Sequence, residues 1–252
     1  MSSFIKSPNL PKGEVKSVAI SSEAEKAISK LNQLGIKTIE INKSAYLPAG
    51  IDSHADLQIL HLEDNRFLTA TEHLCTGESK KKINIERLRG NLGKKYPFDV
   101  PLNCVFIGNK LICNTNTVAL QVLEFAEESG FQVIHVNQGY TRCSTAVINK
   151  DAIITDDITI FTAAQNFLND VLFISKGSIR LNGYSYGFIG GCCGKISKNK
   201  LAFNGRIDSH ENANSIIDFL SKHNIEPIEL HNDCLYDIGG IIPITEDLPD
   251  LA

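Results

Sequence analysis

A cysteine beside an arginine is a clear candidate for chemistry in this sequence. Cys143 follows Arg142 at the predicted start of a hairpin. A thiolate is a nucleophile, and a neighbouring guanidinium can lower the pKa of a thiol. We therefore consider Cys143 a candidate nucleophile or ligand contact. The alternative is that Cys143 is a small buried residue that begins a strand, with Arg142 pointing into solvent.

Two further sets of residues could hold a proton or a cation. His54 and Asp56 flank Ala55, and an extended backbone would place both side chains on one face. They could form a base with its orienting carboxylate, or simply a hydrogen-bonded pair that fixes the loop. Asp237 precedes Gly239-Gly240 and could bind a guanidinium or amine, unless it only caps a turn.

A glycine-rich stretch at 183–194 contains Tyr184 and Tyr186. Glycines allow close approach of the backbone to a ligand or to another segment. The stretch lacks the Gly-Lys-Ser/Thr sequence of a phosphate-binding loop, which argues against a phosphate site. Tyr186 is the candidate ligand contact in this stretch. The adjacent Cys192-Cys193 pair is interpreted as part of a tightly packed strand, and its role stays open.

The seven cysteines do not show metal-ligand spacing. Cys-x-x-Cys is absent from the sequence, so we expect no structural zinc and no other metal site. The odd count favours a reducing compartment in which most thiols act as small apolar residues. The residues 1–6 lack the basic and apolar segments of a signal peptide, and together these features predict a cytoplasmic protein.

A repeated unit of hairpin, helix and strand is predicted to position these residues. Apolar residues at helical spacing are followed by a stop such as Gly35 or Gly130 and then by a short apolar strand. A weaker copy has a helix through Ile85, Leu88 and Leu92. The predicted strands lie at 36–41, 98–102, 131–136, 171–174 and 225–230. The predicted hairpins lie at 57–70, 104–113, 145–155 and 195–203.

The fifth hairpin is not contiguous in the sequence. Its halves are predicted at 18–20 and 241–244, so that the first and last strands would pair and close a ring. We predict one domain over residues 1–252, with peripheral tails at 1–16 and 246–252. A doubly wound parallel sheet is the second choice, because hairpins rather than single strands recur between the helices and the first strand lacks a glycine loop.

Five such units closing into a ring resemble the pentein fold, a five-bladed α/β propeller. It is the fold of guanidino-group-modifying enzymes: deiminases of arginine and agmatine, dimethylargininases and amidinotransferases. The resemblance spans roughly residues 17–246. Its closest local match is the segment at 47–59, which resembles a dimethylargininase segment that carries substrate-binding acids. The stretches 137–144 and 183–191 indicate a narrower branch without an assigned function.

The resemblance implies chemistry whose main parts are absent from their expected places. The family uses a cysteine nucleophile just before the closing strand, but residues 237–244 contain no cysteine. The family histidine precedes a hairpin, and Thr141 stands where it is expected. Because a threonine cannot carry a proton near neutral pH, we expect the family's deiminase or hydrolase mechanism not to operate here.

Three functions follow as hypotheses. The first is a propeller without the family's catalytic pair that binds a small cationic or amino-acid-like molecule and needs no cofactor. Its ligand would be bound by His54, Asp56, Arg142, Tyr186 and Asp237. The second is an active hydrolase of guanidino-type C–N bonds, with Cys143 as nucleophile and His54 as proton carrier. The third is a ribosome- or protein-binding module of the same fold.

Composition narrows the classes of partner. The chain has 252 residues and a formal net charge of -4. No basic stripe is visible, so duplex nucleic acid is not an expected partner. No apolar run approaches the roughly 18 residues that a membrane span requires. The sequence leaves the ligand and the oligomeric state undetermined.

Overall fold

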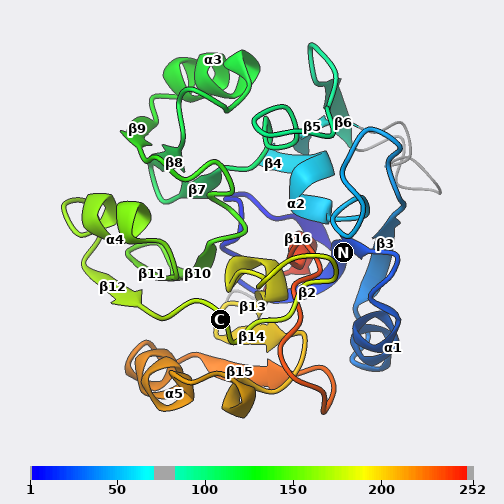
Figure 1. Cartoon of the computed structure of the whole chain (residues 1–252), viewed down its shortest axis with the longest axis vertical. Helices are drawn as coiled ribbons and strands as arrows, with labels where there is room; N and C mark the ends of the chain where they lie inside the picture. Colours follow the sequence, from blue (N-terminus) through cyan, green and yellow to red (C-terminus); the bar gives the residue numbers. More distant parts are fainter. Residues whose placement is uncertain (1, 71–82, 249–252) are drawn as a thin grey trace.

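The computed structural model describes residues 2–70 and 83–248, and its strands form four sheets in a mixed α/β fold. Four helices lie at the periphery of the view in Figure 1: α1 (Glu25–Gln33), α3 (Leu120–Glu128), α4 (Ile158–Ala164) and α5 (Ala213–Lys222). The short helix α2 (Ala55–Gln58) lies inside them. Within the described ranges, no helix combines the length and the apolarity needed to cross a membrane.

Three of the sheets share one construction. In each, two antiparallel strands form a hairpin and a third strand pairs with the second in parallel. The first is β4 (Ile59–Glu63), β5 (Arg66–Thr69) and β6 (Asn84–Arg87). The second is β7 (Val105–Ile107), β8 (Lys110–Cys113) and β9 (Gln132–His135). The third is β10 (Thr145–Asn149), β11 (Ala152–Thr155) and β12 (Asp170–Phe173).

The fourth sheet has seven strands and contains both ends of the described chain. Its strands are β1 (Ser3–Phe4), β2 (Glu14–Ser21), β3 (Lys37–Ile41), β13 (Cys193–Ser197), β14 (Lys200–Phe203), β15 (Glu226–Glu229) and β16 (Ile242–Asp247). Strand β16 pairs with β2 in antiparallel fashion, with Ile242 opposite Ala19. The predicted pairing of the first and last strands is confirmed.

The N-terminal segment is more than the peripheral tail expected for residues 1–16. Strand β1 pairs with β16, and Ile5 is fully buried. The backbone N–H groups of Lys12 and Gly13 donate to the buried carboxylate of Glu246, at 2.5 and 2.6 Å. The reason is that a buried carboxylate needs donors, and among the described residues the N-terminal segment supplies those that Glu246 accepts.

The helices bury their predicted apolar stripes against the sheets. Ala27 and Leu31 of α1 are fully buried and share a cluster with Val18 and Ile20 of β2. Burying a leucine in this way stabilises the fold by about 1.5–3 kcal/mol. A left-handed residue follows α1, α3 and α5, where the chain turns toward the next strand: Gly35 (φ 77°), Gly130 (φ 72°) and Asn224 (φ 54°).

The predicted helix through Ile85, Leu88 and Leu92 is wrong, and so is the strand at 98–102. Residues Asn84–Arg87 form β6, because they pair in parallel with β5. Residues 98–102 are turns and irregular backbone, and Phe98 is 66% exposed. Residues 71–82, which lie between β5 and β6 and include the lysine-rich residues 80–82, are outside the described residues.

Candidate functional site

A cavity of about 230 Å³, called the inner cavity below, contains several of the predicted residues. One part of its wall is apolar or aromatic: Ile51, Leu57, Tyr140, Leu181, Tyr184, Tyr186 and Phe188. The other part is polar: His54, Cys143, Ser185 and Asp237. The site therefore combines aromatic rings with one carboxyl, one imidazole and one thiol.

Asp237 is the buried acid of the inner cavity. It lies on the segment that leads into β16, and its side chain is 1% exposed. Its Oδ2 accepts the backbone N–H of Phe188 at 2.9 Å, and its Oδ1 accepts that of Gly239 at 2.9 Å. Burial raises the pKa of Asp237, and the nearby His54 opposes the rise. When Asp237 is ionised, its buried negative charge favours a cation beside it.

Two glycines fit closely around the Asp237 carboxyl. A Cβ on Gly191 would lie 2.0 Å from its Oδ1, and a Cβ on Gly187 would lie 2.5 Å from its Cβ. The glycine-rich stretch therefore serves close packing around this acid, which agrees with its lack of a phosphate-loop sequence. Gly239 is required for two reasons. Its φ of 74° is one that other residues rarely adopt, and a Cβ there would lie 2.4 Å from the Cβ of His54.

His54 and Asp56 do not form the predicted pair on one face of an extended segment. Residues Ala55–Gln58 form helix α2, with His54 as its N-cap residue, and this turn directs the two side chains to different partners. His54 Nδ1 lies 3.8 Å from Asp237 Oδ1. Asp56 Oδ2 accepts a hydrogen bond from the thiol of Cys143 at 3.0 Å.

Cys143 is a buried thiol with polar partners. The amide Nδ2 of Asn103 donates to its Sγ at 3.2 Å, and Asn103 Oδ1 accepts the backbone N–H of Cys143 at 3.2 Å. Burial raises the pKa of Cys143 well above its ordinary value, and the charges of Asp56 and Asp237 raise it further. The expectation that Arg142 lowers this pKa is therefore wrong.

Arg142 is buried instead of pointing into solvent. Its Nη1 donates to the carbonyl oxygens of Thr145 and Gly190, both at 3.1 Å. Arg142 and Asp56 do not line the inner cavity; they line a separate space of about 20 Å³. Among the described residues, Asp56 Oδ1 has no hydrogen-bond partner. Arg142 and Asp56 therefore act on the site through residues that they hydrogen-bond, such as Gly190 and Cys143.

Aromatic side chains form the other wall. Tyr140 and Phe188 stack with ring centroids 5.9 Å apart, and Tyr186 meets Phe188 edge-on at 5.8 Å. The hydroxyl of Tyr140 donates to Asp99 at 2.5 Å. Lys176 Nζ lies 5.9 Å from the centroid of the Tyr186 ring. These rings present electron-rich faces on which a cation can bind.

Sequence reasoning missed Asn103 as part of the site. Its position in the repeated unit was the available signal, because Asn103 precedes β7 by two residues as Cys143 precedes β10. Thr141, which stands where the resemblance led us to expect a histidine, donates its hydroxyl to Gln138 O and is buried. Within the described ranges, no three His, Cys, Asp or Glu residues are grouped so as to hold a metal ion.

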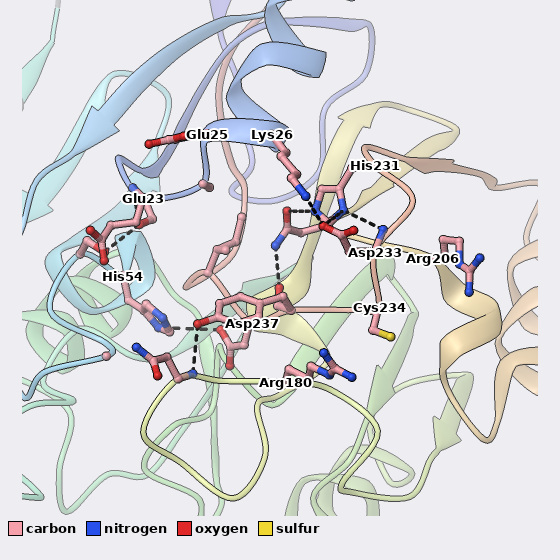
Figure 2. Close-up of a pocket in the computed structure, with 18 of the residues that line it drawn as sticks. Glu23, Glu25, Lys26, His54, Arg180, Arg206, His231, Asp233, Cys234 and Asp237 are labelled. Atoms are coloured by element: carbon pink, nitrogen blue, oxygen red, sulfur yellow. Dashed lines mark hydrogen bonds and ion pairs between the residues drawn. The ribbon is translucent and has the colours of Figure 1, made fainter.

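A second cavity of about 740 Å³, called the outer cavity, is open and polar. His54 and Asp237 line both cavities and form the wall between them. Figure 2 shows these two side chains facing each other at one side of the outer cavity. The figure also shows Arg180, Cys234 and Arg206 along another side, with Glu23 and Glu25 opposite them.

Comparison with protein families gives one match. The model of a family described as "Family of unknown function (DUF6873)" matches residues 19–242. A search of curated proteins found no match. The matched range extends from β2 to the first residue of β16 and contains every residue of the site.

Solved structures similar to this chain include a deiminase, DDAH and an amidinotransferase. Agmatine deiminase of C. jejuni has a TM-score of 0.56 at 13% identity, over 96% of this chain and 97% of that chain. DDAH from Pseudomonas aeruginosa, complexed with citrulline, has 0.53 at 9%, over 90% and 96%. An amidinotransferase from Microseira wollei in saxitoxin biosynthesis has 0.52 at 9%, over 88% and 91%. At these identities the structural similarity establishes the fold alone. The family match over residues 19–242 shows that the chain belongs to the family of unknown function DUF6873, and its mixed α/β fold is shared with the pentein guanidino-modifying enzymes.

Proposed function

We propose that this protein is a five-bladed α/β propeller that binds a small organic cation in the inner cavity. The blade assignment rests on strand pairing. Within the seven-stranded sheet, β16–β2–β3 and β13–β14–β15 repeat the antiparallel-then-parallel order of the three smaller sheets. One residue pair, Ser197 with Glu14, joins these two sets. Each set is one blade, which gives five with the three smaller sheets.

The observation that carries the binding proposal is the buried Asp237 carboxyl beside a wall of aromatic rings. Removing a carboxylate from water is costly unless a positive group or several donors face it. Two backbone N–H groups and the nearby His54 offset part of this cost for Asp237, while Asp56 adds negative charge nearby. A bound ammonium or guanidinium would supply further positive charge.

The aromatic wall supports the same class of ligand. Tyr140, Tyr186 and Phe188 line the inner cavity on the side of the glycine-rich stretch. Ring faces attract cations by about 0.5–2 kcal/mol, more when water is excluded. Lys176 already places its ammonium over Tyr186, which supports this use of the ring. A carboxyl with aromatic rings selects for cations over neutral molecules of the same size.

We propose binding in preference to turnover because of the state of Cys143. A hydrolase of guanidino C–N bonds would need a thiolate. The Cys143 thiol keeps its proton and donates a hydrogen bond to Asp56, and its pKa is raised, so the thiol form is favoured. The hydrolase stays the second candidate, because Cys143 and His54 line one cavity.

Calorimetric titration with arginine, agmatine and methylated arginines tests the binding proposal. We expect at least one of them to bind, and Asp237→Asn to weaken it by at least about tenfold, since a charged hydrogen bond contributes about 1.5–3 kcal/mol. Asp218→Asn, on the exposed face of α5, is the charge-matched control and should bind as the native protein does. Tyr186→Ala should weaken binding about threefold and serves if Asp237→Asn does not fold.

Unchanged affinity in Asp237→Asn, or no binding of any cation by the native protein, would refute the proposal. Assays of the same compounds for citrulline, urea or ammonia separate the two candidates. Turnover that disappears in Cys143→Ala would establish the hydrolase instead. Turnover that persists in Cys143→Ala would point to a contaminating enzyme and leave the binding result to decide.

A further inference from the structure

Backbone pairing brings four side chains to one side of the outer cavity. Arg180 pairs with Tyr236, and Arg206 pairs with Cys234, both as parallel bridges on the segment that leads to Asp237. Paired residues on adjacent extended segments point to the same face, and so do residues two apart along one segment. The side chains of Arg180, Tyr236, Cys234 and Arg206 therefore share a face, and all four line the outer cavity.

Both arginines of this cavity keep guanidinium donors that no hydrogen bond among the described residues uses. Lys26 pairs with Asp233 at 2.5 Å, and Glu23 pairs with Lys43 at 2.9 Å. Within the part of the chain that the structure describes, the Arg206 side chain has one partner: its Nε lies 3.1 Å from Asp208 Oδ1. Among the described residues, the guanidinium of Arg180 has no hydrogen bond or ion pair, although its charge, after that of Lys26, helps to lower the pKa of Asp233 in the same cavity. Glu25 lies across the cavity from both (Figure 2).

We infer that Arg180 and Arg206 form an anion subsite in the outer cavity, which takes a carboxylate or phosphate group. Two guanidinium groups on one face present planar sets of N–H donors that match the oxygens of either anion. The segment 233–237 fixes the separation of the two arginines, because it hydrogen-bonds to the backbone of each. Arg206 N donates to Asp233 O at 2.8 Å, and Asp237 N donates to Arg180 O at 2.9 Å.

This subsite does not depend on the cation proposed for the inner cavity. Its donors come from the outer face of the segment that carries Asp237, whereas the cation would contact the Asp237 carboxyl and the aromatic rings. One subsite can therefore fail its test while the other passes.

Cys234 offers a local reporter of anion binding. It lies between the two arginines in Figure 2 and is partly exposed, whereas the other cysteines of the described ranges are buried. Iodoacetate and iodoacetamide both alkylate a thiolate with loss of iodide and formation of a thioether. They differ in that iodoacetate carries a carboxylate. The ratio of their rate constants at Cys234, followed by mass spectrometry of its peptide, therefore measures attraction of an anion and cancels changes in the thiol pKa.

We expect Arg180→Gln combined with Arg206→Gln to lower the iodoacetate-to-iodoacetamide ratio about tenfold, with a smaller fall for each single variant. Inorganic phosphate should slow alkylation of Cys234 by iodoacetamide in the native protein and not in the double variant. Arg89→Gln is the matched control, because Arg89 is exposed, pairs with Glu124 of α3 and is not part of the outer cavity. This variant should leave both results unchanged. A ratio equal in the native protein and the double variant would overturn the inference, as would phosphate protection that survives the double substitution.

Discussion

Replacing Asp156 by asparagine should stabilise the protein at pH 8 and leave its stability nearly unchanged at pH 4. Asp156 follows β11 and is 1% exposed. Its Oδ2 accepts the backbone N–H of Ile189 at 3.0 Å, whereas Oδ1 has no partner among the described residues. Asparagine has the same shape, can accept the same hydrogen bond and carries no charge, so it removes the cost of an ionised group at this position.

The size of the effect follows from the pKa. Burial raises the pKa of Asp156 from 3.8 to about 7, and the charges of Asp237 and Asp157 add to the rise. The folded protein therefore binds this proton more tightly than the unfolded chain does. The free energy of unfolding falls as pH rises between about 4 and 7, by about 4 kcal/mol at 1.36 kcal/mol for each pH unit. The asparagine variant lacks this loss.

Urea unfolding of both proteins at pH 4, 5.5, 7 and 8 measures the difference directly. We expect the stability advantage of Asp156→Asn to grow with pH and to level off above pH 7. A difference that is constant across this range would refute the reasoning, because the substitution would then act through packing alone. The neighbouring Asp157 is a matched control. Burial acts to raise its pKa, but hydrogen bonds from Thr159 and Ile160 lower it overall. An Asp157→Asn variant should therefore not gain stability with rising pH.

Three further predictions concern single residues. Asp157→Ala should cost about 1 kcal/mol in thermal or urea unfolding, because its side chain caps α4; an unchanged midpoint would contradict the assigned cap. Gly191→Ala should destabilise the protein by about 1–3 kcal/mol in urea, because its Cβ would overlap the Asp237 carboxyl; native stability would show that the glycine is not required. Mass spectrometry after brief iodoacetamide treatment at pH 7 should find Cys234 alkylated well before Cys143, which is buried and has a raised pKa; equal rates would show that the inner cavity is more open than described.

The sequence predicted much of the fold because its signals are local. Turn residues such as Asp64 and Gly108, which adopt φ of 43° and 58°, stand between apolar runs and mark the hairpins correctly. Strand β6 was missed because Asn84–Arg87 lies next to Leu88 and Leu92, and their spacing resembles a helix. Only the parallel pairing with β5 identifies it as a strand.

The sequence singled out His54, Cys143, Tyr186 and Asp237, and all four line the inner cavity. Their roles in binding or catalysis stay predictions. Burial, and after it the charge of Asp56, 87 residues away in sequence, raises the pKa of Cys143, so inspection of the neighbouring Arg142 gave the opposite direction. Ligand binding, cytoplasmic location and the ribosome-binding alternative stay predictions.

The pairing of β2 with β16 has a consequence for how the molecule is made. The hydrogen bond from Lys12 to Glu246 joins residues 234 positions apart. Strands β2 and β16 cannot pair until β16 has also left the ribosome. Such distant contacts are formed late, because closing so long a loop costs entropy before any pairing repays it. During synthesis, the exposed edge of β2 is a place where a nascent chain would need protection from premature association.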